Sequence, residues 1–132
     1  MRELLLLRHA EAMTAGPDGR DTERPLSLRG EAQASAAGAW LAEHHAAPDA
    51  VLCSPARRAQ MTADAVGKAL RMPQAQFVHA IYHATPGELL ALLTEGRSAG
   101  ARGMSPATVA WIELTDGALE PGHGRLHALW SP

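Results

Sequence analysis

Residues 3–11 read Glu-Leu-Leu-Leu-Leu-Arg-His-Ala-Glu, an apolar run that ends at an arginine–histidine pair. Such a run of leucines is typical of a strand buried on both faces in the middle of a parallel sheet, with helices on each side. Arg8 and His9 then lie at the carboxyl end of the strand, where open parallel sheets bind ligands. A guanidinium matches the geometry of phosphate, and an imidazole can act as a nucleophile or carry a proton at neutral pH. The pair therefore predicts a phosphoryl-transfer site.

The composition describes one small domain without an extended charged surface. The 132 residues include 12 basic and 14 acidic side chains, and the formal net charge is -2. We therefore expect no binding to nucleic acid or to a membrane surface. A single cysteine, Cys53, excludes an internal disulfide, and the opening leucine run is far shorter than the roughly 20 apolar residues of a membrane span. These observations favour a cytoplasmic protein, and we expect it to be a monomer.

A turn-rich loop and an amphipathic helix follow the first strand. Residues 12–26 are rich in glycine, proline and aspartate, which predicts a loop over the strand end. Ser27 is a good N-cap, and residues 28–46 predict a helix with His44 and His45 in its last turn, where they suit the helix dipole. The expected apolar stripe recurs every fourth residue: Leu28, Ala32, Ala36 and Trp40.

The rest of the chain continues the alternation of strands and helices. Short apolar segments at 50–53 and 75–79 predict strands, and residues 54–71 and 85–96 predict helices. The expected apolar face of the helix at 54–71 is Ala59, Thr62, Ala63, Val66 and Leu70. Two further runs, 108–114 and 125–130, predict an antiparallel strand pair. We therefore expect an α/β three-layer sandwich, with a mostly parallel central sheet, helices on both faces and a C-terminal antiparallel strand pair.

A second predicted strand also ends in arginines. Residues 53–62 read Cys-Ser-Pro-Ala-Arg-Arg-Ala-Gln-Met-Thr. If the two strands are neighbours, Arg8 and either Arg57 or Arg58 converge on one pocket beside the imidazole, and the following helix start adds a positive dipole end. Two guanidinium groups would neutralise the phosphoryl oxygens while His9 attacks phosphorus, giving a phosphohistidine that water cleaves.

Three stretches of the chain form an ordered pattern. Arg8-His9-Ala10 is similar to an Arg-His-Gly or Arg-His-Ala motif at a strand end, and residues 21–30 resemble Asp-x-x-Arg-Pro-Leu-Ser/Thr-x-x-Gly. Residues 54–62 resemble Ser-Pro-x-x-Arg-Ala-x-Gln-Thr, with Met61 in place of the usual glutamine. Together these motifs, which span most of the chain, resemble the histidine phosphatase superfamily and, within it, the short SixA-type phosphohistidine phosphatases.

The resemblance implies roles for three residues. His9 would be the nucleophile, Arg8 would bind phosphate, and the register of the third motif selects Arg58 over Arg57 as the second phosphate arginine. This catalytic and substrate-binding set implies no metal and no cofactor. The implied reaction is hydrolysis of phosphohistidine in a signalling or phosphotransfer protein, such as a histidine-phosphotransfer domain, or of a small phosphoester. A phosphoglycerate mutase is the weaker interpretation, because the chain has little room for substrate-enclosing insertions.

One element of the family has no counterpart in the sequence. In relatives a second catalytic histidine follows an apolar strand in a Gly-His motif, and nothing between residues 93 and 108 supplies it. The leucines of the helix at 85–96 resemble a junction of two merged helices. We therefore expect one domain over residues 1–132 that is internally shortened near residues 93–97. The alternative is a degenerate member with weak or no turnover that binds phosphate or a phosphorylated partner through Arg8, His9 and Arg58.

Other residues offer competing chemistry. A cysteine phosphatase would need an arginine at the sixth position after Cys53, and this position is alanine. His79 and His83 have metal-ligand spacing only in a helix, and we expect a strand passing into a loop there. The pair Gly122-His123 lies in the turn-rich connection of the last two strands, so we do not expect it to replace the missing group.

The general acid is left open by the sequence. Glu11 and Glu88 both lie near predicted strand ends, and solvent exposure is the expected state of each. A phosphohistidine substrate reduces the need for a strong protein acid, because its leaving group is a nitrogen.

Overall fold

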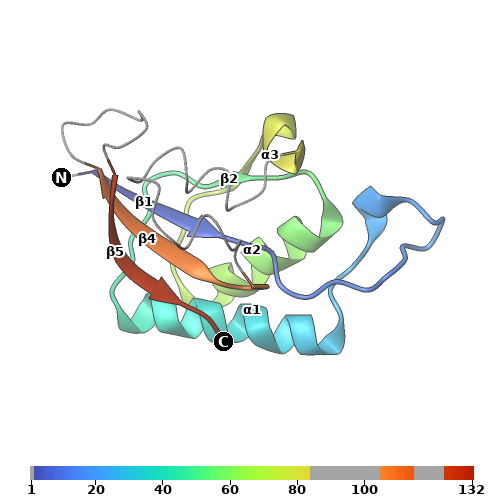
Figure 1. Cartoon of the computed structure of the whole chain (residues 1–132), viewed down its shortest axis with the longest axis horizontal. Coiled ribbons are helices and arrows are strands. Elements are labelled where there is room, and N and C mark those ends of the chain that lie inside the picture. The colour runs from blue at the N-terminus through green and yellow to red at the C-terminus, as the bar shows by residue number, and fades with distance from the viewer. Residues whose placement is uncertain (1, 84–104, 115–123) are drawn as a thin grey trace. The chain divides into compact units, whose positions relative to one another are not determined.

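The computed structural model describes residues 2–83, 105–114 and 124–132 (Figure 1). Its elements are β1 (Arg2–Leu7), η1 (Asp21–Glu23), α1 (Leu28–Glu43), β2 (Leu52–Cys53), α2 (Arg57–Ala69), β3 (Gln76–Phe77), α3 (His79–His83), β4 (Val109–Leu114) and β5 (Gly124–Trp130). They fall into two compact units, one containing β1, β4 and β5 and the other made of residues His9–His83. No helix in these ranges is long and apolar enough to cross a bilayer.

The strands β1, β4 and β5 form a three-stranded antiparallel sheet in that order (Figure 1). The ladder continues past β1, because the backbone N–H of Arg8 donates to the carbonyl oxygen of Thr108 at 3.1 Å. Ala110 and Ile112 of β4 are fully buried. Leu4 and Leu6 of β1 pack against them, so the leucine run contributes to the core of this unit.

The predicted direction of pairing for β1 is wrong. Its paired neighbour among the described strands is β4, which runs antiparallel to it. A run of leucines reports that a strand is buried but says nothing about the direction of the strand beside it. Parallel pairing occurs within the described residues only between β2 and β3, two residues each. The α/β class and the C-terminal antiparallel pair of β4 and β5 are confirmed, whereas the mostly parallel sheet is not.

The helix α1 begins where the sequence predicted. The hydroxyl of Ser27 accepts a hydrogen bond from the backbone N–H of Gly30 at 3.0 Å, which confirms the N-cap. The helix ends at Glu43 rather than at residue 46, and Nδ1 of His44 donates to the carbonyl oxygen of Trp40 at 2.8 Å. The histidine therefore satisfies a carbonyl of the last turn, as expected.

The predicted apolar stripe of α1 is wrong. Leu28 is 86% exposed, and the buried residues are Gly30, Ala34, Ala37, Gly38 and Leu41. A strict spacing of four drifts around a helix of about 3.6 residues per turn, whereas mixed spacings of three and four stay on one face. A Cβ at Gly38 would lie 3.1 Å from Cα of Val66 in α2. The small residues therefore allow the two helices to approach closely.

The segment at residues 79–83 is also not as predicted. It forms the helix α3 of five residues instead of a strand passing into a loop. Even so, the described part of the chain has no group of three or more His, Cys, Asp or Glu side chains that could hold a metal ion. Three predictions lie outside the described residues: the helix at 85–96 with Glu88, the shortening near residues 93–97 and the position of Gly122-His123.

Candidate active site

His9 is the first residue of the unit His9–His83, and its ring is half-buried. Nδ1 of His9 lies 2.7 Å from the carbonyl oxygen of Ala10. Because a carbonyl oxygen only accepts hydrogen bonds, Nδ1 carries the proton and the lone pair of the neutral ring is on Nε2. A histidine nucleophile needs such an unprotonated nitrogen. The contact with the Ala10 carbonyl therefore leaves the lone pair of the neutral ring on Nε2.

Thr62, a residue of α2, connects the segment that follows His9 to this helix. The backbone N–H of Ala10 donates to Oγ1 of Thr62 at 3.1 Å, and that hydroxyl donates to the carbonyl oxygen of Arg58 at 2.7 Å. Ala10 is fully buried and Thr62 is 2% exposed, so these groups have little access to water. One side chain thus joins the residue after His9 to the first turn of α2, and it brings the first and third motifs together.

This role of Thr62 was not predicted from the sequence, in which Thr62 is expected on the apolar face of the helix. The available signal was a hydroxyl at an apolar position within the third motif. A buried hydroxyl needs a partner, and here the partners belong to the two segments with the predicted site residues.

The side chain of Arg58 is held in place and only 13% exposed. Its Nη1 donates to the backbone oxygen of Asp21 at 2.9 Å, and its Nη2 donates to Oδ2 of the same residue at 3.2 Å. The ring centroid of Tyr82 lies 5.7 Å from Cζ of Arg58, within the range of a cation–π contact. Arg57, in contrast, is exposed. The structure thus distinguishes Arg58, whose side chain is held, from Arg57, although both arginines follow the same strand.

Asp21, the first residue of the second motif, receives several donors. Its Oδ1 accepts from Nη1 of Arg24 at 2.9 Å, and its Oδ2 accepts from Arg58 and from the hydroxyl of Tyr82. The hydrogen bonds from Tyr82 and Arg24, together with the charge of Arg58, hold the pKa of Asp21 well below its usual range. The same bond to Asp21 raises the pKa of Tyr82. The sequence places Asp21 at the start of a family motif, but no role for its side chain was predicted.

The end of the second motif anchors the loop against Glu11. The backbone N–H of Ser27 donates to the carbonyl oxygen of Glu11 at 3.0 Å, and Oγ of Ser27 donates to the Glu11 carboxylate at 2.9 Å. A Cβ at Gly30 would lie 1.9 Å from that carbonyl oxygen, so only glycine fits. These contacts give Glu11 a structural role at the start of α1.

Arg8 belongs to the other unit, through β1 and its bond to Thr108. Its side chain is half-buried. Of the three predicted site residues, His9 and Arg58 lie in one unit, where Thr62 joins the residue after His9 to the backbone of Arg58, and Arg8 precedes His9 in the chain.

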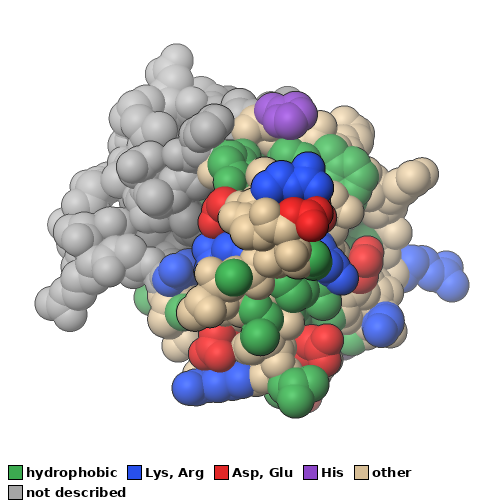
Figure 2. All heavy atoms as spheres, turned by 90° about the vertical axis from the view of Figure 1, so that its right-hand side faces the viewer, with side chains coloured by type: hydrophobic (Ala, Val, Ile, Leu, Met, Phe, Trp, Pro, Cys, Tyr) green, Lys and Arg blue, Asp and Glu red, His purple; other side chains and the backbone are tan. Residues whose placement is uncertain are grey.

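The face that carries the loop before α1 has mixed charge. Figure 2 shows basic and acidic side chains interspersed over this face among the described residues. Asp18 pairs with Arg20 at 3.1 Å, and Asp21 pairs with Arg24 at 2.9 Å. Anion binding here would therefore depend on single guanidinium groups and not on a broad basic patch.

Sequence comparison identifies relatives of this chain. A profile of the histidine phosphatase superfamily (branch 1) matches residues 4–80. Two uncharacterized proteins of Mycobacterium tuberculosis, Rv1276c and MT1313, are each 42% identical over 85 residues, which make up 64% of this chain and 51% of theirs. The chain thus spans about half the length of these curated relatives.

Several solved structures are similar in fold. The protein histidine phosphatase SixA complexed with tungstate has a TM-score of 0.81 at 22% identity, and the match covers 99% of this chain and 97% of SixA. A protein described as SixA from Nakamurella multipartitia has a TM-score of 0.81 at 26% identity, and the match covers 99% of this chain and 96% of that protein. Another protein described as SixA, from Agrobacterium tumefaciens, has a TM-score of 0.80 at 22% identity. The match covers 98% of this chain and 97% of that protein.

The matched range of the superfamily profile includes more than half of the chain and all three motifs, with His9, Asp21 and Arg58. The similarity to the SixA structures extends over nearly the full length of both chains. The chain therefore belongs to the histidine phosphatase superfamily.

Proposed function

We propose that this protein is a phosphatase that uses His9 as its nucleophile and acts on phosphohistidine in a signalling or phosphotransfer protein. The observation that carries the proposal is the link from the backbone N–H of Ala10 through the hydroxyl of Thr62 to the backbone oxygen of Arg58, which joins the residue after His9 to the residue that carries the second arginine. The substrate class follows from the similarity to structures described as SixA phosphohistidine phosphatases.

The first step transfers the phosphoryl group to His9. Nε2 of His9 attacks phosphorus, the bond from phosphorus to the substrate nitrogen breaks, and that nitrogen takes a proton from solvent. The guanidinium groups of Arg8 and Arg58 bind the phosphoryl oxygens and stabilise their charge. Since Nδ1 keeps its proton, its bond to the carbonyl of Ala10 stabilises the positive charge on the phosphorylated ring.

Water then attacks the phosphorus of phospho-His9. The bond between phosphorus and Nε2 breaks, inorganic phosphate leaves, and the ring recovers its lone pair. The nitrogen leaving group of phosphohistidine makes the first step less dependent on a protein acid than the cleavage of a phosphoester is.

A second candidate function is phosphate or phosphoprotein binding with weak or no turnover. The observation that favours it is the sequence between residues 93 and 108, which lacks the Gly-His motif expected of the family. Removing one oxyanion-stabilising donor from an active site lowers the rate by about 100- to 1000-fold. The binding residues would be the same, so turnover distinguishes the two functions.

The test uses the full chain with a phosphorylated histidine-phosphotransfer domain and with an aryl phosphate. We expect turnover that His9→Ala abolishes, and an acid-labile, alkali-stable phosphoryl group on the wild-type chain only. Turnover that survives in His9→Ala would contradict the mechanism. Thermal stabilisation by inorganic phosphate without turnover would support the binding function instead.

A further inference from the structure

Asp21 and Tyr82 contact the guanidinium of Arg58, yet the reaction above assigns them no step. Both lie in the same unit as Arg58, one in η1 and the other in α3. Neither residue was expected at the site from the sequence. Their contacts therefore require an explanation of their own.

We propose that Asp21 is a positioning residue that, ordered by Tyr82, aims the Arg58 guanidinium at the phosphoryl group of the substrate. The inference rests on the proposed function, because it takes Arg58 as a phosphate ligand. It adds the η1 loop and α3 to the elements that prepare the site.

Asp21 binds Arg58 through both its backbone oxygen and its carboxylate. The backbone oxygen accepts from Nη1 at 2.9 Å and the carboxylate accepts from Nη2 at 3.2 Å, so two contacts on different nitrogens fix the rotation of the guanidinium plane. A guanidinium has more N–H donors than these, and the others suit the oxygens of a phosphoryl group. An arginine fixed before substrate binds loses less side-chain entropy on binding.

Asp21 is itself ordered by hydrogen bonds from Tyr82 and Arg24. Its carboxylate is 51% exposed, and an isolated side chain at such exposure would sample several rotamers. Tyr82 donates to Oδ2 and Arg24 donates to Oδ1 at 2.9 Å. Nε of Arg24 also donates to the carbonyl oxygen of Met13 at 2.7 Å. The orientation of Asp21 is thus built into the loop before α1.

A carboxylate bound to a phosphate-binding arginine could act in the opposite way. It could occupy the arginine in place of substrate, and phosphate would then have to displace it. The two roles predict opposite effects of removing Asp21 on the affinity for phosphate, so they can be distinguished.

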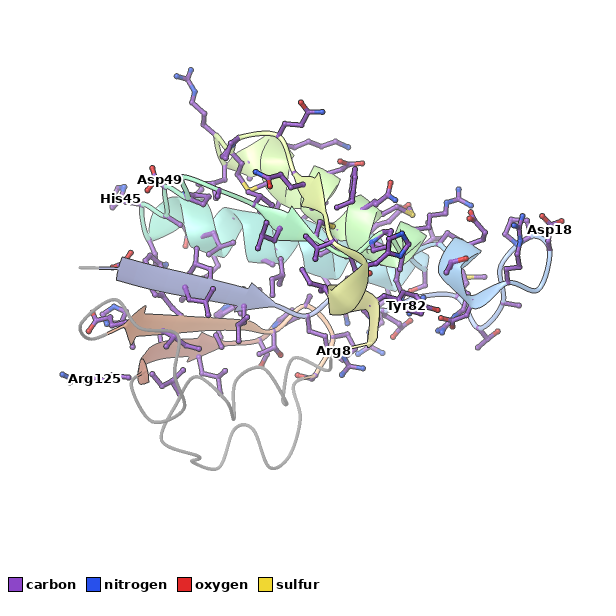
Figure 3. The ribbon with its side chains drawn as sticks, turned by 90° about the horizontal axis from the view of Figure 1, so that it is seen from above. Arg8, Asp18, His45, Asp49, Tyr82 and Arg125 are labelled. Carbon is purple, nitrogen blue, oxygen red and sulfur yellow. The ribbon has the colours of Figure 1, made fainter. Side chains whose placement is uncertain are left out.

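The first experiment measures the affinity for inorganic phosphate by calorimetry in the wild type, Asp21→Ala and Asp18→Ala. Asp18 is the matched control, since it lies in the same loop, pairs with Arg20 at 3.1 Å and sits at the outer end of the loop, away from Tyr82 (Figure 3). We expect Asp21→Ala to weaken phosphate binding about tenfold, the size of one charge-assisted hydrogen bond, and Asp18→Ala to leave it unchanged. Unchanged or tighter binding by Asp21→Ala would overturn the proposal.

A conservative variant separates positioning from folding of the loop. Asp21→Asn keeps an oxygen that can accept from Arg58 and Tyr82, so it should recover part of the affinity that Asp21→Ala loses. Tyr82→Phe keeps the ring over Arg58 and should weaken phosphate binding less than Asp21→Ala. If Asp21→Asn is no better than Asp21→Ala while both have wild-type thermal stability, the hydrogen-bonding role of Asp21 is wrong.

The second experiment uses the fact that the chain has one tyrosine, so the tyrosinate absorbance titrates Tyr82 alone. We expect its raised pKa to persist when the protein is saturated with inorganic phosphate, because Asp21 keeps its bonds while Arg58 binds the anion. A fall of this pKa toward the ordinary value on phosphate binding would show displacement of Asp21 and overturn the proposal. Asp21→Asn should lower the pKa of Tyr82, and Asp18→Asn should not.

The failures of the two proposals are distinguishable. Wild-type protein that neither binds phosphate nor shows His9-dependent turnover overturns the proposed function and this inference with it. His9-dependent turnover combined with wild-type phosphate affinity in Asp21→Ala overturns the positioning role alone.

Discussion

The two units of this protein are organised by different interactions. In the sheet of β1, β4 and β5, backbone ladders and buried apolar side chains such as Ile112 hold the strands together. In residues His9–His83, polar contacts connect segments far apart in the chain: a buried one joins Ala10 to Thr62, and a more exposed one joins Asp21 to Arg58. Different apolar side chains of similar volume can fill a buried core, whereas a hydrogen bond needs a particular donor and acceptor. The comparison predicts that substitutions in the sheet change stability, and that polar substitutions in the other unit change activity.

The largest expected effect on stability comes from truncating the core of the sheet. Ile112 is fully buried, so Ile112→Ala should lower the free energy of unfolding by about 2–5 kcal/mol. Urea denaturation measures this loss. Leu129→Ala, at a position 51% exposed on β5, is the control and should change it much less. A reduced kcat in the folded fraction of Ile112→Ala would contradict the expectation that substitutions in the sheet change stability and not activity.

The largest expected effect on activity comes from Arg58. Arg58→Ala should lower kcat/KM by about 100- to 1000-fold, because a preorganised charged donor to the phosphoryl oxygens is lost. The adjacent Arg57→Ala is the matched control, since that side chain is exposed, and it should retain activity within about twofold. Steady-state kinetics with an aryl phosphate measure both. Equal losses in the two variants would contradict the assignment of Arg58.

The link through Thr62 should affect stability and activity together. Thr62→Val removes the hydroxyl and leaves the buried N–H of Ala10 without this partner, which costs about 1–3 kcal/mol in the free energy of unfolding. We also expect a lower kcat, because the segment with His9 loses its tie to α2. Thr62→Ser keeps the hydroxyl and should restore most of the kcat. The exposed Thr14→Val should change neither quantity.

The smallest expected effect is the pH dependence that comes from Asp21. Its pKa is lowered in the folded protein, first by the bond from Tyr82, so its contribution to stability is present above the unfolded value, near the ordinary 3.8. That contribution is lost as the pH falls below this value toward the folded pKa. The carboxylate is half-exposed, so solvent screening keeps the effect small.

Urea denaturation at neutral and acid pH, in the wild type and in Asp21→Asn, measures this contribution. The wild type should be the more stable at neutral pH, and the difference should shrink as the solution becomes more acid. A difference that stays constant down to low pH would show that the charge of Asp21 does not stabilise the fold.

Local patterns predicted the features that depend on local physics. Ser27 caps α1 because a hydroxyl before a helix meets a free N–H wherever the helix lies, and β4 and β5 pair as neighbours in sequence. The buried face of α1 was not predicted, because burial depends on the partner: small residues around Gly38 meet α2, and the larger Leu28 faces solvent. The short helix α3 was missed because few residues carry too weak a periodic signal.

The sequence by itself determined the chemical set of this protein: a histidine and an arginine after a leucine strand, a second arginine in the register of a family motif, and the superfamily to which they belong. Those features are properties of residue type and spacing along the chain. Only the tertiary structure decided that β1 pairs antiparallel with β4, that Thr62 joins the histidine segment to Arg58, and that Asp21 and Tyr82 hold that arginine. The physical reason is that strand pairing and side-chain hydrogen bonds depend on distances in space between residues remote in sequence, which no local pattern records.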